Sequence, residues 1–126
     1  MAENQPSIIL VEDELAVAKL IEFKLKRENF DLKHYDNGLK GLEAIKKYKP
    51  DAVILDVMLP SMNGFEILRN IREDAEISET KVILLTSKNR VEDLKMGFGL
   101  KADEYIDKPF QPDSLILRLN RILNIN

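Results

Sequence analysis

Short runs of apolar and β-branched residues recur along the chain. Three of these runs are continuous, which is typical of strands in a parallel sheet that is covered on both faces. They are residues 7–11 (SIILV), 52–56 (AVILD) and 81–86 (KVILLT). Residues 31–35 (DLKHY) alternate between apolar and polar positions, which suits a strand near an edge, and residues 104–106 (EYI) form a short fifth run. The pattern predicts five strands.

Helical periodicity fills the segments between these runs. It covers five stretches, at residues 15–28, 39–47, 65–73, 90–100 and 112 to nearly the end of the chain. In the first stretch, Leu15, Ala18, Ile21 and Leu25 form one stripe that is expected to face the core, and Asn29 follows where a left-handed residue would end the helix. This alternation predicts an α/β fold: a single doubly wound five-stranded parallel sheet with five helices and right-handed crossovers.

The chain shows no repeat, linker or low-complexity segment, so one domain is expected to fill residues 1–126, with no output domain visible. The fourth helical stretch contains Gly97 and Gly99. Each glycine lowers helix stability by roughly 1 kcal/mol relative to alanine, so this helix is expected to be short or mobile. Met96 and Leu100 lie off its core-facing stripe, which indicates either a frayed end or an exposed apolar patch for a partner.

Composition and charge narrow the possible functions. Hydrophobic residues make up 44% of the chain and charged residues 33%, which is typical of a folded, water-soluble domain. The formal net charge is -3 and no basic stripe occurs, which argues against direct nucleic-acid binding. The absence of cysteine excludes disulfides and thiol catalysis. No membrane-length apolar run or signal peptide is found, so the expected location is cytoplasmic.

Polar residues stand at the ends of four predicted strands. Glu12 and Asp13 follow the first, Asp56 ends the third, Thr86 ends the fourth and Lys108 follows the fifth. In a parallel sheet these side chains gather at one edge. Clustered carboxylates need a counter-charge, and a hard cation such as Mg²⁺ is the usual one. With the lysine as a second positive centre, the assembly suits attack of a carboxylate on a phosphoryl group.

Four stretches carry a resemblance to a known family. They are residues 9–14 (ILVEDE), 56–64 (DVMLPSMNG), 85–87 (LTS) and 102–110 (ADEYIDKPF). Over essentially its whole length the chain resembles the receiver domains of two-component response regulators. The chemotaxis member of that family is a known example of the flavodoxin-like sheet order 2-1-3-4-5, so the resemblance implies this order.

The resemblance also implies roles for individual residues. Asp56 is expected to accept the phosphoryl group and Lys108 to bind it, with a cis bond between Lys108 and Pro109. Thr86 is expected to bond to the group once it is attached. Thr86 and Tyr105 would form a switch pair, in which the hydroxyl moves toward the phosphoryl group and the ring rotates into the vacated space. A static, packed Tyr105 is the alternative.

A bound Mg²⁺ is a further implication of the resemblance. Asp13, Asp56 and the backbone carbonyl of Met58 are expected to bind it directly, and Glu12 would act through water. Pro60 and Gly64 would be the turn residues after the acceptor strand. Glu12 and Asp13 could instead only cap the following helix. The domain would catalyse no reaction beyond its own phosphorylation and dephosphorylation.

The implied partners are a histidine kinase or phosphotransfer protein, which donates the phosphoryl group, and a downstream protein. The latter would bind the face made of the fourth helix, fifth strand and fifth helix. Arg118 and Asp103 match positions that form salt bridges across a dimer in related receivers, but Ser114 stands where an acidic partner is usual. A monomer and a phosphorylation-dependent dimer therefore both stay open. His34 is predicted to be a surface residue away from the acids, and no phosphate carrier.

Three other functions are alternatives to this one. A haloacid-dehalogenase-type phosphatase would need a second acid two residues after Asp56, where Met58 stands. A nucleotide-binding module would need a glycine-rich loop after the first strand, where acidic residues 12–14 stand. A receiver-like domain that binds partners without phosphorylation is the strongest alternative. The complete set of acids, lysine and threonine argues against it.

Overall fold

The computed structural model describes residues 5–86 and 101–125. Its strands are β1 (Ser7–Val11), β2 (Asp31–Tyr35), β3 (Ala52–Asp56), β4 (Lys81–Thr86) and β5 (Glu104–Asp107). Its helices are α1 (Leu15–Arg27), α2 (Gly38–Tyr48), α3 (Gly64–Glu73) and α5 (Pro112–Ile122). The predicted fourth helix, with the hypothetical patch at Met96 and Leu100, lies outside the described residues. Within the described ranges, no helix has the length and apolar character needed to cross a bilayer.

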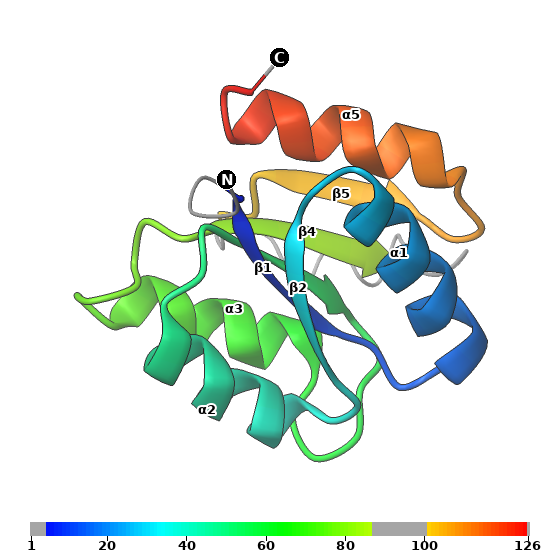
Figure 1. The fold of residues 1–126 in the computed structure, drawn as a ribbon. Helices are drawn as coiled ribbons and strands as arrows, with labels where there is room; N and C mark the ends of the chain where they lie inside the picture. Colours follow the sequence, from blue (N-terminus) through cyan, green and yellow to red (C-terminus); the bar gives the residue numbers. More distant parts are fainter. Residues whose placement is uncertain (1–4, 87–100, 126) are drawn as a thin grey trace.

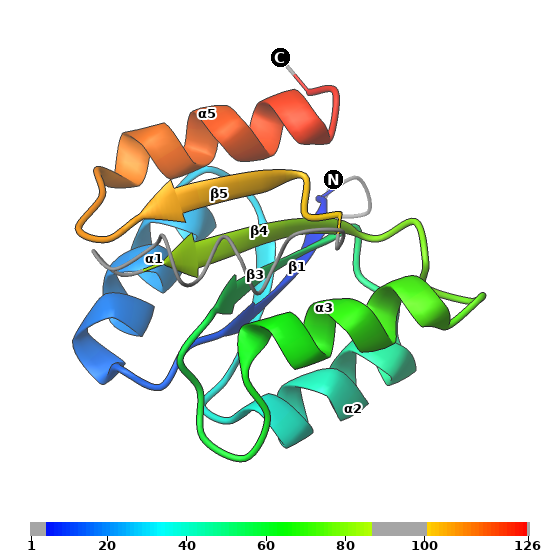
Figure 2. The ribbon, with the colours of Figure 1, turned by 180° about the vertical axis from the view of Figure 1, so that it is seen from behind.

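The strands form one parallel sheet in the order β2-β1-β3-β4-β5. Helices α1 and α5 cover one face of the sheet, and α2 and α3 cover the other, as Figures 1 and 2 show from opposite sides. The predicted α/β class, parallel sheet and strand order are therefore confirmed. In such a sheet all strands end at the same edge, so the residues after β1, β3 and β5 are brought together there.

The continuous apolar runs reflect two hydrophobic cores, one on each face of the sheet. Successive strand residues point to opposite faces. Ile54 belongs to the core beneath α1 and α5, whereas Val53 and Leu55 belong to the core above α2 and α3. Every residue of β3 is buried. A strand that packs on both sides cannot alternate in hydrophobicity, which explains the pattern seen in the sequence.

The helix ends confirm one prediction from the sequence and contradict another. Asn29 has a φ of 68°, which confirms the predicted left-handed residue after α1. Asn63 and Glu66 form a capping box at the start of α3, each side chain accepting from the other residue's backbone N–H at 2.9 Å. The prediction that Leu15 faces the core is wrong, because its side chain is 62% exposed. Leu15 begins α1 beyond the end of β1, so the first turn projects past the edge of the sheet.

Arg72, near the end of α3, ties this helix to the segments that precede β4 and β5. Its guanidinium donates to the carbonyls of Ser78, Thr80 and Lys101 at 2.7–3.0 Å. It also pairs with the Asp103 carboxylate at 3.2 Å. The planar, five-donor guanidinium is suited to holding several acceptors at once, so this side chain fixes the edge of the sheet that lies opposite the strand ends.

Candidate functional site

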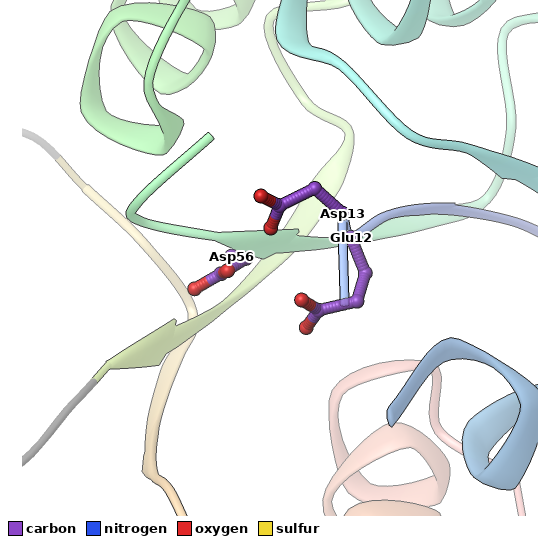
Figure 3. Close-up of side chains that lie close together, drawn as sticks. All are labelled: Glu12, Asp13 and Asp56. Atoms are coloured by element: carbon purple, nitrogen blue, oxygen red, sulfur yellow. The ribbon is translucent and has the colours of Figure 1, made fainter. Parts of the chain in front are cut away.

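Three carboxylates meet where β1 and β3 end. Val11 pairs with Leu55 as the last matched residues of these neighbouring strands, so the residues that follow, Glu12 and Asp56, leave the sheet side by side. Oxygens of Glu12, Asp13 and Asp56 all lie within 4.8 Å of one another. Figure 3 shows Glu12 and Asp13 at the end of β1 and Asp56 at the end of β3, with their carboxylates gathered at one edge. Glu12 and Asp56 are buried, whereas Asp13 is exposed.

The Lys108 ammonium is shared among the acids of this edge. Its Nζ lies 3.0 Å from Glu12 Oε1, 3.0 Å from Glu14 Oε1 and 3.3 Å from Asp56 Oδ2. The structure therefore brings together Glu12, Asp13, Asp56 and Lys108, as the sequence predicted. One ammonium cannot neutralise several carboxylates, so the site keeps an excess of negative charge that favours a cation.

Lys108 is placed by its attachment to β4 and β5. Thr86 pairs with Asp107 across the two strands, and the Lys108 N–H donates to the Thr86 carbonyl at 2.7 Å. The bond between Lys108 and Pro109 is cis, as predicted. Although burial disfavours the charged ammonium, its close contacts with the Glu14 and Glu12 carboxylates and the attraction of Asp56 raise the pKa of Lys108 above its ordinary value. The lysine therefore stays charged at neutral pH.

The Asp56 carboxylate lies in a tight environment. Only 7% of its side chain is exposed, and its Oδ1 accepts from the Met58 N–H at 3.4 Å. Burial, reinforced by the negative charge of Glu12, raises the pKa of Asp56 to about 7, while Lys108 acts in the opposite direction. A side chain at Gly64 would place its Cβ 2.6 Å from the Asp56 carbonyl oxygen, so a glycine is needed where α3 begins.

Glu12 is held by its side chain and by its backbone. The residue is fully buried, and its Oε2 accepts from the Glu14 N–H at 3.1 Å. Its Oε1 is in ion-pair contact with Lys108 but makes no hydrogen bond within the described part of the chain. Its backbone N–H donates to the Tyr35 carbonyl at 3.0 Å, and its carbonyl lies 2.7 Å from Nε2 of His34.

His34 is the site neighbour that sequence reasoning missed. Its side chain is half-buried and contacts the backbone of Glu12, so the prediction that it lies away from the acids is wrong. The contact follows from the strand register, which the sequence alone does not give. His34 lies on β2, the strand next to β1, and pairs with Leu10. Leu10 stands two residues before Glu12, so the His34 ring lies within reach of the Glu12 backbone.

The expected switch residues lie on β4, which pairs with β3, and on β5, which pairs with β4 on its other side. Thr86 is buried, and its hydroxyl donates to Asp107 Oδ1 at 3.3 Å. Tyr105 is partly buried against the core above α2 and α3, and this burial raises its pKa. The side chain of Met58 is 67% exposed beside the site. The described hydrogen bonds of Thr86 do not include Glu12, Asp13 or Asp56, so its role toward a phosphoryl group stays a prediction.

Arg118 and Asp103, the residues that match dimer positions, both have partners within this chain. Arg118 donates to Glu104 Oε1 at 2.9 Å and to the Tyr105 carbonyl at 3.3 Å. Asp103 pairs with Arg72 and also accepts from the Val82 N–H at 2.8 Å. A dimer that used these side chains would have to share or replace the internal bonds.

Residues 8–120 match the family described as "Response regulator receiver domain". The chain therefore belongs to the family of response regulator receiver domains. The acidic cluster of Glu12, Asp13 and Asp56 is typical of the phosphorylation site of such a domain. As a receiver of two-component signalling, the chain is a phosphoryl acceptor and not an enzyme that turns over a separate substrate. Receiver domains interact with histidine kinases.

Known relatives agree with this assignment. The cell cycle response regulator CtrA of Brucella ovis is 38% identical over 116 residues, which cover 92% of this chain and 49% of that protein. The chain thus spans about half the length of the curated relatives it matches. The receiver domain of a signal transduction histidine kinase from Syntrophus aciditrophicus is similar with a TM-score of 0.89, at 27% identity, covering 94% of this chain and 90% of that one.

A third relative is similar in fold. It is the receiver domain of the sensor histidine kinase PA1611 from Pseudomonas aeruginosa, with a TM-score of 0.87 and 24% identity, covering 95% of this chain and 98% of that one. That structure has a magnesium ion coordinated in its active site cleft.

Proposed function

We propose that this chain accepts a phosphoryl group on Asp56 from a histidine kinase or phosphotransfer protein, with the help of Mg²⁺. The observation that carries the proposal is the convergence of Glu12, Asp13 and Asp56 oxygens within 4.8 Å, with the Lys108 ammonium 3.3 Å from Asp56 Oδ2. The parallel sheet holds these groups at the edge where ligands bind in such folds.

The donor set fits a hard divalent cation. Mg²⁺ is bound in proteins by one or two carboxylates, waters and carbonyl oxygens. Asp13 and Asp56 with the Met58 carbonyl are the proposed direct ligands, and Glu12 would act through a water. The magnesium ion in the PA1611 receiver supports this choice. When bound, Mg²⁺ would neutralise negative charge on the acids and on the transferring phosphoryl oxygens.

Asp56 must be ionised in order to attack. Without metal, burial and the charge of Glu12 raise the pKa of Asp56 to about 7, which opposes its ionisation at neutral pH. A bound cation and the Lys108 ammonium both favour the carboxylate. An Asp56 oxygen then forms a bond to phosphorus as the bond between phosphorus and the donor's leaving group breaks. The Lys108 ammonium stabilises the charge on the phosphoryl oxygens during the transfer.

Thr86 and Tyr105 are the proposed route from the site to a partner surface. To reach a group on Asp56, the Thr86 hydroxyl would have to leave the Asp107 oxygen to which it now donates. The partner surface would include β5 and α5 together with the predicted fourth helix. Phosphorylation adds charge at the edge of the sheet and would shift the population between two states of this surface.

Incubation with acetyl phosphate tests the acceptor assignment. With Mg²⁺ present, intact-mass measurement is expected to show one added phosphoryl group, which does not form when EDTA is present from the start and is absent in Asp56→Asn. Asp31→Asn, which changes an exposed aspartate at the start of β2, is the matched control and is expected to behave like the wild type. Beryllofluoride, a phosphoryl mimic, is expected to show the same dependence.

The same experiment tests the alternative, a receiver-like domain that binds partners without phosphorylation. An adduct that survives in Asp56→Asn would refute Asp56 as the acceptor. No adduct in the wild type with either reagent would favour a domain that binds its partners without phosphorylation. Sizing the protein with and without beryllofluoride decides between a monomer and a phosphorylation-dependent dimer.

A further inference from the structure

Beyond the end of β1, the backbone of Glu12 is bound from both sides by neighbouring residues of β2. The Glu12 N–H donates to the Tyr35 carbonyl at 3.0 Å, and the Glu12 carbonyl lies 2.7 Å from His34 Nε2. That carbonyl belongs to the peptide group that joins Glu12 to Asp13. The orientation of this peptide group decides where the Asp13 carboxylate stands relative to Asp56.

The direction of the hydrogen bond from His34 follows from its partner. A carbonyl oxygen can only accept, so Nε2 must carry the hydrogen. Both the Nε2–H tautomer of the neutral ring and the doubly protonated ring satisfy this condition. The contact therefore persists whether or not the ring is charged. The half-buried ring, which extends from a paired strand, is a fixed support for this donor.

From this geometry we propose that His34 is a positioning residue for the metal site. Its Nε2–H fixes the peptide between Glu12 and Asp13 and so holds the exposed Asp13 carboxylate within reach of Asp56. The buried Glu12 side chain is anchored separately by the Glu14 N–H and by Lys108. Asp13 has no such anchor among the described hydrogen bonds and ion pairs, so its placement depends most on the backbone. This inference rests on the proposed function, because Mg²⁺ is the ion concerned.

Two substitutions distinguish the effect of the Nε2–H donor from that of the ring itself. His34→Leu keeps an apolar side chain of similar size but removes the donor. His34→Gln places an amide N–H near the position of Nε2 and restores it. Residues that orient a metal ligand without binding the metal typically contribute one to two orders of magnitude in metal affinity. We therefore expect His34→Leu to weaken Mg²⁺ binding about tenfold. His34→Gln is expected to bind Mg²⁺ within about twofold of wild type. The chain has no tryptophan, so calorimetry is the suitable measurement.

A second readout needs no metal. The Asp13 amide nitrogen shares the peptide group of the Glu12 carbonyl, so its NMR chemical shift reports the hydrogen bond directly. In EDTA this resonance is expected to move in His34→Leu and to return toward the wild-type position in His34→Gln. Ile71→Val, in the buried part of α3, is the control for lost stability. It is expected to lower the urea midpoint while leaving the Asp13 resonance and the Mg²⁺ affinity unchanged.

The outcomes are distinct. Equal Mg²⁺ affinity in wild type and His34→Leu would overturn this inference alone. Weak binding by both His34 variants would overturn it too, because the ring and not its donor would then matter. If the wild type bound no Mg²⁺, the proposed function would fail and this inference with it. Should His34→Leu not fold, His34→Asn takes its place, since its amide is one methylene too short to reach the carbonyl.

Discussion

Replacing Asp56 with asparagine is expected to stabilise the metal-free protein at alkaline pH. Burial and the charge of Glu12 raise the pKa of Asp56 from 3.8 to about 7. At about 1.4 kcal/mol per pK unit, ionising Asp56 in the fold costs at most about 4.5 kcal/mol. Solvent near the exposed Asp13 screens part of this energy. We therefore expect Asp56→Asn to raise the free energy of unfolding by about 2–3 kcal/mol where the wild-type residue is ionised.

The pH dependence has a definite sign. Below about pH 4 the Asp56 carboxyl is protonated in both the folded and the unfolded state, so it contributes no difference. Between about pH 4 and pH 7 the folded state binds more protons than the unfolded state, and the favourable contribution of the protonated group is lost as the pH rises. The stability gap between Asp56→Asn and the wild type is therefore expected to open across this window and to stay constant above it.

Urea unfolding in EDTA, followed by circular dichroism at about pH 4.5 and about pH 8.5, measures this gap. Asp31→Asn is the control and is expected to change stability by less than about 0.5 kcal/mol at either pH. Added Mg²⁺ is expected to stabilise the wild type more than Asp56→Asn, because it binds the folded carboxylates. If Asp56→Asn were no more stable than the wild type at alkaline pH in EDTA, the reasoning about buried charge would be refuted.

Three further substitutions test neighbouring features. Gly64→Ala is expected to lower the urea-unfolding free energy by about 1–3 kcal/mol, because its Cβ would lie 2.6 Å from the Asp56 carbonyl oxygen; unchanged stability would contradict the tight approach. Arg72→Lys is expected to cost roughly 2–3 kcal/mol in the same assay, since an ammonium cannot reproduce the bonds to three carbonyls and Asp103; a cost near zero would argue against this network. Lys108→Met is expected to abolish the acyl phosphate seen by mass measurement yet to tighten Mg²⁺ binding in calorimetry, because the acids lose a competing cation; weaker binding would exclude that competition.

The sequence was most informative where a single physical cause dominates. Strands covered on both faces must be apolar throughout, so residues 52–56 could be recognised as a central strand. Once the sheet was taken as parallel, the meeting of Glu12, Asp56 and Lys108 followed, because all the strands end at one edge. The strand order could not be worked out from periodicity and came from the family resemblance.

The sequence was least informative about side chains near the end of a helix or strand, because local geometry determines their exposure and contacts. Leu15 fits the apolar stripe of α1, yet periodicity does not reveal that the first turn projects beyond the sheet. His34 reads as a polar residue on an edge strand. Its bond to the Glu12 carbonyl depends on where β1 stops, which neither propensity nor spacing determines. The sharing of Lys108 with Glu14 depends on the reach of two long side chains.

Asp56, the proposed acceptor, ends the strand at the centre of the sheet. Strand β3 is hydrogen-bonded to β1 on one side and to β4 on the other, and all of its residues are buried. A group added to Asp56 is therefore attached to a strand that is held on both sides and has little room to move. The steric and electrostatic disturbance of a chemical modification must be absorbed by the connections that leave the sheet, such as the turn between Val57 and Asn63. A time-resolved hydrogen-exchange experiment would locate the response there, with the interior of β3 as the invariant reference.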